Sequence, residues 1–348
     1  MAQLHQREAA SGDDPERALR ACPLASARLR TAVAAGAWKE RGNQNVFWVP
    51  GTAGYDRGAD WATVDVCVVT KLLYSVASDP GLAACRVATE NRCRLVIDIT
   101  DYPFRRETSP ARTFHTEALK ICDAVVVNSQ RMAEMMASHT PQRLLVIEDA
   151  ILETARTPGY APARKLELLW FGHASNLPYL DECLESLVRF GMRRPCRLTV
   201  VTAEGVGADQ WTRNIDAHFA PAFEARFVPW SLEAMRVALR KCDLVLLPCD
   251  PSRPLKAGAS ANRIAEALVA GRFPVANPLP SYLPFAQAAW LGPDLVEGIE
   301  WALAHPGEVL ARIRHGQALV AENLAADRIG RQWCEFLQAL AGTRNPAA

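Results

Sequence analysis

The chain has 348 residues, of which 49% are hydrophobic and 22% are charged. Its 39 basic side chains balance 38 acidic ones, which gives a formal net charge of +1. The length predicts two domains of ordinary size, the composition excludes bulk disorder, and the balanced charge argues against a dedicated nucleic-acid-binding protein.

Ten cysteines are spread along the chain and no two of them form a CxxC pair, so the zinc-binding and thioredoxin-like signatures are absent. Dispersed thiols in apolar runs favour buried free cysteines in a reducing compartment. The charged N-terminal segment lacks the apolar core of a secretory signal, and no apolar run approaches the ~18 to 20 residues of a spanning helix. We therefore expect a cytoplasmic protein without a transmembrane segment, for which peripheral membrane contact stays open.

The first part of the chain alternates short apolar runs with helical patterns. Residues 1–20 are rich in alanine, serine and charge, which predicts a mobile tail. Continuous apolar runs, rather than alternating ones, predict strands of a parallel sheet that is covered on both faces. These runs occupy residues 45–50, 63–70, 93–99, 124–128 and 143–148. Helical patterns lie between them, at residues 27–40, 79–91, 110–121 and 129–139.

The same alternation begins again after a Pro- and Gly-rich linker at residues 155–165. Strands are predicted at residues 166–171, 197–202, 225–229, 243–248 and 273–276. Helices are predicted at residues 178–191, 231–241, 260–271, 294–304, 306–325 and 327–341.

Strands and helices that alternate twice along a chain predict an α/β protein of two tandem Rossmann-like domains with a cleft between them. We expect a first domain at residues 21–155 and a second at residues 156–325. The last helix, within residues 326–348, is expected to cross back to the first domain. Ligands of such sheets bind outside the carboxyl ends of the strands, where the strand order reverses.

Common motifs of enzymes with such sheets are absent from the sequence. There is no GxGxxG after a strand, which disfavours a nicotinamide-dependent enzyme, and no GxxxxGK[ST], which disfavours P-loop phosphotransfer. GxSxG and HExxH, the signals of α/β-hydrolases and zinc proteases, are also missing. Gly51 and Gly54 follow a predicted strand, but their spacing does not match a dinucleotide-binding loop, so they predict a turn.

One stretch, residues 242–282, has a pattern suited to a nucleotide. A buried strand ends at Pro248, a polar loop contains Lys256, and a helix then begins near Ser260. A helix N-terminus offers free N–H groups and a positive dipole end, which suit a diphosphate. Lys256 and Arg263 are placed to neutralise phosphates without a metal. Glu266, further along the helix, is placed to accept hydrogen bonds from a ribose diol.

This arrangement resembles the donor site of GT-B glycosyltransferases, particularly those of families 4 and 1, in which a glutamate precedes a turn of the form EAxxxGxPVV. Here the matching run is residues 266–275, EALVAGRFPV. The resemblance implies that Glu266 binds the ribose, and that Lys256 and the backbone around Ser260 bind the diphosphate, with Asn262 and Arg263 beside them. Many members carry a second glutamate eight positions earlier, and that position is Gly258 in this chain.

The resemblance also covers most of the remaining chain. The segment WFGHASN, residues 170–176, stands where such enzymes bring a Gly-containing turn to the donor, and it contributes the candidates Gly172, His173 and Asn176. Residues 22–30, CPLASARLR, look like the opening loop beside the cleft. That loop contributes Ser26 and Arg28 as candidate contacts to acceptor or phosphate, together with Gly51 in the turn after the predicted strand.

The resemblance implies transfer of a sugar from a nucleoside-diphospho-sugar to a glycan, glycolipid or small-molecule acceptor, as in polysaccharide biosynthesis. No cofactor or metal is expected, and no DxD motif occurs. An inverting enzyme needs a base, for which Asp101, Asp98 and His115 are candidates, whereas a retaining one needs none. Two alternatives stay open: a nucleotide-sugar epimerase on the same fold, and a catalytically silent glycan-binding or scaffold protein.

Overall fold

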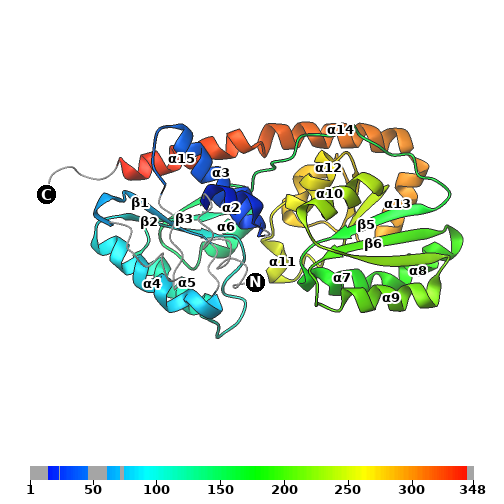
Figure 1. Ribbon diagram of the computed structural model, residues 1–348, viewed down its shortest axis with the longest axis horizontal. Coiled ribbons are helices and arrows are strands. Elements are labelled where there is room, and N and C mark those ends of the chain that lie inside the picture. The colour runs from blue at the N-terminus through cyan, green and yellow to red at the C-terminus, as the bar shows by residue number, and fades with distance from the viewer. Residues whose placement is uncertain (1–14, 23, 46–60, 71–73, 343–348) are drawn as a thin grey trace. The chain divides into compact units, whose positions relative to one another are not determined.

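The computed structural model describes residues 15–22, 24–45, 61–70 and 74–342 (Figure 1). They form two compact units. The first unit contains the described residues up to Ala150, the short segment Gly258–Ser260 and the described residues from Leu324 on. The second unit contains Ile151–Ala257 and Ala261–Asn323. The chain therefore passes from one unit to the other at Ala150, five residues before the expected boundary.

The first unit is built on a parallel sheet, whose described strands follow one another in chain order, β1-β2-β3-β4. Apolar side chains fill these strands and are buried in cores on both faces of the sheet, as the continuous apolar runs predict. The strands are β1 (Val66–Val69), β2 (Arg94–Ile99), β3 (Ala124–Val127) and β4 (Arg143–Val146).

Helices connect and cover these strands, and two of them begin with a clear capping signal. Ser109 accepts a hydrogen bond from the amide of Arg112 and is followed by a proline, and Ser129 accepts one from the amide of Met132. The helical elements are α2 (Pro15–Ala21), the π-helix η1 (Ala27–Thr31), α3 (Ala32–Glu40), η2 (Trp61–Thr63), α4 (Tyr74–Glu90), α5 (Pro110–Ile121) and α6 (Gln130–Met136).

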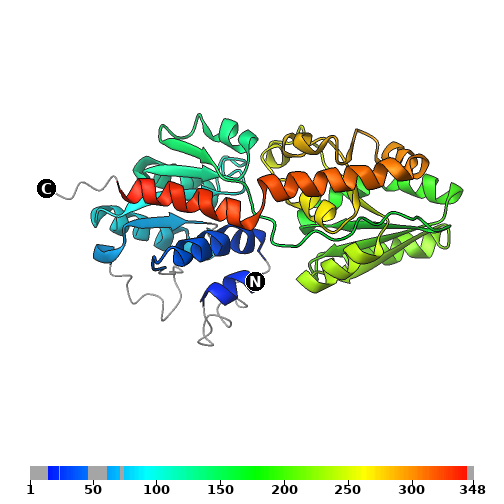
Figure 2. The same cartoon turned by 90° about the horizontal axis from the view of Figure 1, so that it is seen from above.

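The last helix, α15 (Ala326–Ala341), belongs to the first unit. Its residues Ile329, Trp333 and Phe336 are buried in the core that also holds Val33 and Val96. Figures 1 and 2 both draw α15 alongside α3, and a side chain at Gly330 would lie 2.7 Å from the Cβ of Ala37. Close packing against α3 therefore joins the end of the chain to its first unit.

The second unit contains a larger parallel sheet with the strand order β10-β9-β8-β5-β6-β7. This is the doubly wound order of dinucleotide-binding folds, in which the chain direction across the sheet reverses between the first and fourth strands, here β5 and β8. The strands are β5 (Leu166–Phe171), β6 (Cys196–Thr202), β7 (Phe223–Pro229), β8 (Leu244–Leu247), β9 (Phe273–Ala276) and β10 (Trp290–Leu291).

Helices of the second unit pack their apolar faces on this sheet around a core that contains Trp170, Phe223 and Phe273. The helical elements are η3 (Ala174–Asn176), α7 (Leu177–Glu182), α8 (Leu184–Arg193), α9 (Ala208–Phe219), α10 (Leu232–Lys241), α11 (Pro254–Ala257), α12 (Asn262–Val269), η4 (Pro280–Phe285), α13 (Leu295–Ala304) and α14 (Pro306–Asn323).

Two sequence-based expectations differ from this structure, and a third falls almost wholly outside the residues that it describes. Pro15–Ala21 forms α2, which packs against η1 and α3, so the expected tail is wrong over these residues. Helix α9 was not predicted, because its buried positions include the polar Thr212 between Ala208 and Ile215. The strand expected at residues 45–50 lies outside the described residues except for Asn45.

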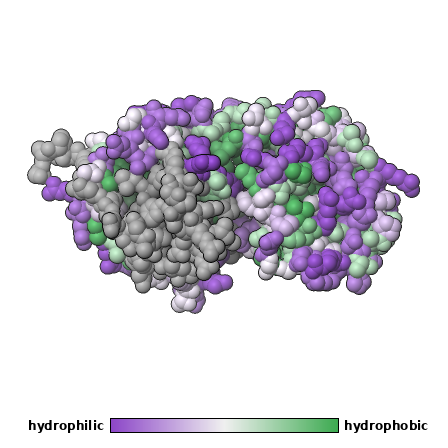
Figure 3. All heavy atoms as spheres, in the orientation of Figure 1, coloured by the Kyte–Doolittle hydropathy of each residue, from purple (hydrophilic) through white to green (hydrophobic). Residues whose placement is uncertain are grey.

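Large exposed apolar side chains are scattered rather than gathered. The most exposed of them, Met192 and Leu283, lie far apart in the sequence at 60% and 57% exposure. On the face drawn in Figure 3, hydrophilic residues cover much of the second unit and apolar ones occur in small groups. Within the described part of the chain, no helix has both the length and the apolar character needed to cross a membrane.

Candidate functional site

The carboxyl edge of the second sheet holds most of the predicted donor residues. Strand β5 ends at Phe171 and is followed directly by Gly172. Strand β8 ends at Leu247 and leads through Cys249 to the short helix α11, which carries Lys256 where the sequence predicted a loop. These two strands are neighbours and flank the reversal of strand order. Open α/β sheets bind their ligands at this position.

Arg263, in the first turn of α12, projects toward the turn after β5. A Cβ built at Gly172 would lie 3.5 Å from Nη1 of Arg263 and 3.5 Å from Nδ2 of Asn176. Arg263 Nη1 is shielded from solvent and has no hydrogen-bond partner among the described residues. A buried donor without a partner costs free energy.

Lys256 lies at the same edge. Its ammonium group donates a hydrogen bond to the Oδ1 of Asn176 and lies 5.8 Å from the ring centroid of Tyr179. The guanidinium of Arg253 lies 5.0 Å from the same ring. A cation over an aromatic face is attracted by the negative potential of that face. Tyr179 and Asn176 therefore hold the amine of Lys256 in place.

The positive charges of these cations affect the pKa values of two buried side chains. Burial raises the pKa of the Cys249 thiol to about 11, and the positive charges of Arg263 and Lys256 oppose that rise. Burial also raises the pKa of Tyr282, and again the charge of Arg263 opposes the shift. Both cations therefore act on one small region at the carboxyl edge. Such a region favours an anionic ligand.

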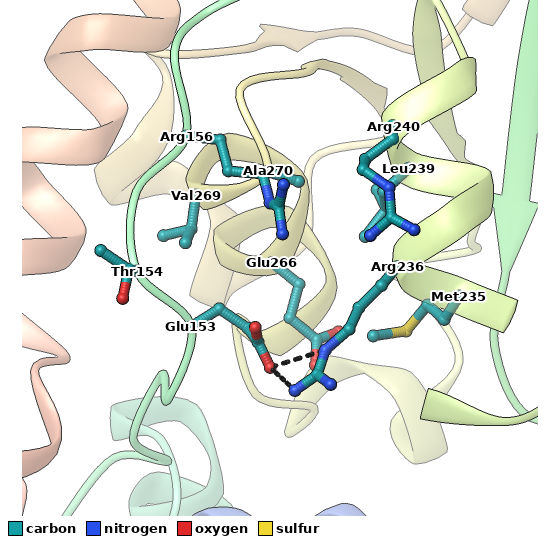
Figure 4. A pocket seen from close by; sticks show the side chains of 10 residues that line it. All are labelled: Glu153, Thr154, Arg156, Met235, Arg236, Leu239, Arg240, Glu266, Val269 and Ala270. Carbon is teal, nitrogen blue, oxygen red and sulfur yellow. Dashed lines mark hydrogen bonds and ion pairs between the residues drawn. The ribbon is translucent and has the colours of Figure 1, made fainter. Parts of the chain in front are cut away.

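Glu266 lines a pocket one helical turn beyond Arg263 (Figure 4). The pocket lies between α10, α12 and the segment that enters the second unit. Across from Glu266, Arg236 donates from Nε and Nη2 to Oε1 of Glu153, at 3.2 and 2.5 Å. The remaining lining residues are Thr154, Arg156, Met235, Leu239, Arg240, Val269 and Ala270.

The other predicted donor residues are placed differently. His173 is exposed, and its Nδ1 accepts hydrogen bonds from the amide and hydroxyl of Ser175 at 3.2 and 2.9 Å. It therefore caps the short helix η3. Asn262 is the first residue of α12. Ser260 groups with the first unit.

In the first unit, the candidate base Asp98 is held in a buried ion pair. Its Oδ1 accepts from Nη2 of Arg30 at 2.6 Å, and both of its oxygens accept from Nε at 3.0 and 3.1 Å. Arg30 also donates to Asp149 at 2.9 Å and to the carbonyl of Ile147 at 2.6 Å. Asp98 therefore serves to anchor η1 on the sheet, since its lone pairs are occupied by Arg30.

The other two candidate bases differ in exposure. Asp101 is exposed just after the carboxyl end of β2. His115 is buried in α5, where its Nδ1 donates to the carbonyl of Ala111 at 2.8 Å. Burial lowers the pKa of His115 to about 4, so its ring is neutral at pH 7. Of the three candidate bases, Asp101 is the one that is exposed to solvent.

The residues proposed for the opening loop are buried. Arg28 donates from Nη1 to the carbonyl of Cys22 at 2.8 Å, and its side chain supports the turn that precedes η1. Ser26 is the N-terminal neighbour of η1 and makes no capping hydrogen bond with its side chain. Gly51 lies outside the described residues.

Sequence reasoning missed the residues that support these sites. Arg30 stood beside the predicted Arg28, but its partners are 68 and 119 residues away. Tyr179 and Arg236 were predicted to lie in helices and were given no role in a site. For Arg236 the sequence did offer a signal of a ligand site, because an arginine lies in the second turn of a helix that follows a strand. Among the described residues, no group of three or more histidine, cysteine, aspartate or glutamate side chains is arranged to hold a metal ion.

Comparison with solved structures places this architecture among known proteins. Anabaena HepE, solved with UDP and glucose, is 16% identical, with 92% of this chain and 84% of HepE covered and a TM-score of 0.60. The UDP-forming trehalose-phosphate synthase of Burkholderia xenovorans is 13% identical over 81% of this chain and 75% of its own, with a TM-score of 0.55. Both are GT-B glycosyltransferases.

The chain has the GT-B fold. The predicted α/β architecture of two tandem Rossmann-like domains is therefore confirmed. A third neighbour, TarM, is 11% identical with a TM-score of 0.58, and the match covers 78% of this chain but about half of TarM, 54%. No protein-family model and no curated protein matches the sequence.

Proposed function

We propose that the protein is a glycosyltransferase that moves a sugar from a nucleoside-diphospho-sugar to an acceptor without a metal ion. One observation carries the proposal: Nη1 of Arg263 is buried without a partner beside Gly172, at the strand reversal of a doubly wound sheet. A guanidinium group donates two hydrogen bonds side by side and so matches a phosphate.

The same cluster of cations is suited to stabilise the nucleoside diphosphate as the leaving group. When a glycosidic bond to the donor breaks, negative charge develops on the diphosphate. Arg263 and Lys256 are fixed cations at that position, and preorganised charges stabilise such a leaving group more than mobile water does. Glu266, one turn further along α12, is placed to accept hydrogen bonds from the ribose hydroxyls. Asp101 is the proposed base if the reaction inverts the sugar.

Uridine diphosphate is the first nucleotide to test. Anabaena HepE was solved with UDP-glucose, and the Burkholderia synthase is described as UDP-forming. These neighbours share the fold at low identity, so they support UDP as a probe and leave the acceptor open. Glycan, glycolipid and small-molecule acceptors are all compatible with the proposal.

The test is a thermal-shift screen with UDP, GDP, ADP, CMP and dTDP in the presence of EDTA. A nucleotide at about a hundred times its dissociation constant stabilises the native state by roughly 2.7 kcal/mol. We expect one nucleotide to raise the melting temperature of the wild type and to lose that effect in Glu266→Ala and Arg263→Met. A shift that requires a divalent metal contradicts the metal-independent mechanism.

Two outcomes favour the alternative functions. If no nucleotide shifts the melting temperature, the protein is a silent glycan-binding or scaffold protein rather than a transferase. If a nucleotide binds, incubation with the matching nucleotide sugar and no acceptor separates the enzymes. An epimerase converts the sugar while it stays attached to the nucleotide, whereas a transferase leaves it unchanged apart from slow hydrolysis.

A further inference from the structure

The pocket beside Glu266 contains a guanidinium group with unused donors. Arg236 projects from the second turn of α10, which follows the carboxyl end of β7. Its Nε and Nη2 are engaged by Glu153, and Nη1 has no hydrogen-bond partner among the described residues. The side chains of Arg236 and Glu153 are each 36% exposed, so solvent reaches this ion pair.

Arg263, Glu266 and the pocket follow one another in the same order as the diphosphate, the ribose and the base of a nucleotide. Arg263 and Glu266 are three residues apart on α12, which is a rise of about 4.5 Å along the helix. A diphosphate at Arg263 therefore brings its ribose toward Glu266 and its base toward the space beyond. That space is the pocket, whose walls include the apolar side chains of Met235, Leu239 and Val269.

The chemistry of Arg236 restricts the base. A guanidinium group carries donors only. It pairs with exocyclic carbonyl oxygens, which uracil, thymine, cytosine and guanine carry and adenine lacks, and it is repelled by the exocyclic amine of adenine. Glu153 accepts two hydrogen bonds from one side of the guanidinium and so fixes the direction of the remaining donors.

We infer that Arg236 is a specificity-determining residue that selects a nucleobase with a carbonyl oxygen, and that Glu153 is its positioning residue. The inference rests on the proposed function, because it assigns the base of the same donor. Figure 4 shows Arg236 and Glu266 on facing helices, with dashed lines that join Arg236 to Glu153. The ligand class is a nucleoside diphosphate whose base carries a carbonyl oxygen. In the test, UDP and GDP represent this class and ADP represents a base without a carbonyl oxygen.

The experiment measures dissociation constants of UDP, GDP and ADP by calorimetry with the full chain. In the wild type we expect UDP or GDP to bind at least tenfold more tightly than ADP. Arg236→Met keeps the length of the side chain and removes its donors. This substitution should raise the dissociation constant of the preferred nucleotide about tenfold, as expected for the loss of one hydrogen bond to a charged group. The dissociation constant of ADP should stay within about twofold of its wild-type value.

Two further variants sharpen the test. Glu153→Gln keeps an acceptor oxygen but loses the charge that fixes Arg236, so it should reduce the preference by less than Arg236→Met does. Lys241→Met removes a positive charge from an exposed position on the same helix, outside the pocket, and should leave all three constants unchanged. A change in Lys241→Met equal to that in Arg236→Met overturns the inference, because net charge alone then explains the effect.

Failure of the inference and failure of the proposed function give different results. If Arg263→Met weakens all three nucleotides while Arg236→Met leaves the preference among them unchanged, the inference is overturned and the donor site stands. A wild-type preference for ADP likewise overturns the inference alone. If no nucleotide binds the wild type, both proposals are overturned together.

Discussion

Each unit places an arginine at the carboxyl edge of its sheet, and the two arginines are used in opposite ways. Arg30, in the first unit, is fully buried and donates to Asp98, Asp149 and the carbonyl of Ile147. Arg263, in the second unit, has a buried nitrogen with no partner among the described residues. Each guanidinium nitrogen of Arg30 therefore has a hydrogen-bond partner, whereas Nη1 of Arg263 has none among the described residues, and a buried donor without a partner costs free energy.

The comparison teaches how to separate a structural charge from a binding one in a protein of this kind. Both arginines lie on helical elements, Arg30 in the last turn of η1 and Arg263 in the first turn of α12. Only the inventory of hydrogen bonds distinguishes them. Three predictions test that distinction, and they are ordered here from the largest expected effect to the smallest.

Substitution of Arg30 should have the largest effect. Arg30→Met leaves two buried carboxylates without their cation, which typically costs about 3 to 5 kcal/mol. We expect the first unit to unfold at much lower denaturant concentration, as followed by circular dichroism in a urea titration. The matched control is Arg94→Met, which breaks the half-exposed ion pair with Asp123 and should cost about 1 kcal/mol or less.

A second control removes the negative charges of the two carboxylates that Arg30→Met leaves without a partner. In the background of Arg30→Met, the changes Asp98→Asn and Asp149→Asn should recover part of the lost stability, since neutral amides are less costly to bury than carboxylates. If Arg30→Met alone costs no more than the control at Arg94, the ion pair is not an anchor, and Asp98 returns as a candidate base.

Substitution of Arg263 should separate binding from stability. Arg263→Met removes a buried donor that has no partner, so the free energy of unfolding should change by about 1 kcal/mol or less. Nucleotide affinity should fall by roughly 10- to 100-fold, the range for a hydrogen bond between charged groups. Calorimetry and a urea titration on the same preparation give both numbers. Large destabilisation with unchanged affinity would assign Arg263 to the same structural class as Arg30.

The smallest effect concerns His115, a site candidate that the structure places in the core. Burial lowers its pKa from 6.5 to about 4, so the folded state favours the neutral ring. Its contribution to stability is therefore complete above pH 6.5 and is lost as the pH falls from there toward 4. Between pH 8 and pH 5.5 the wild type should lose about 1 kcal/mol more than His115→Asn.

Asparagine is the suitable replacement, because its side-chain amide lies near the position of Nδ1 and retains the hydrogen bond to the carbonyl of Ala111. The measurement is the denaturation midpoint of both proteins at the two pH values. Other titrating groups affect both proteins equally and cancel in the difference. Equal pH dependence in the two proteins would mean that the ring of His115 is solvated in the native state.

Much of the fold was predictable because the signals are local. The run AVVV predicts strand β3, and Ser109 followed by Pro110 predicts the start of α5, which the structure places at Pro110. Helix α9 escaped prediction because its inner face carries Thr212, so its apolar periodicity is weak. Strand order in the second unit was not predictable in detail, because pairing of β5 with β8 depends on contacts between segments 76 residues apart.

The candidate site shows the same limit. Lys256, Arg263 and Glu266 were singled out from a contiguous motif, because the local rules of helix termini predict an anion-binding site near the start of a helix. Their roles stay predictions, since the donor has yet to be bound. The sequence did not indicate that Asn176 would contact Lys256, or that Glu153 would contact Arg236, because both contacts join distant segments.

By itself, the sequence determined the α/β class, the division into two halves and the position of the donor motif, because periodicity, capping residues and short motifs act over a few neighbouring residues. Tertiary structure alone decided the partners of each charged side chain. Hydrogen bonds to buried ions depend on the arrangement of residues brought together from far along the chain. That arrangement made Asp98 part of an anchor and left a nitrogen of Arg263 without a partner.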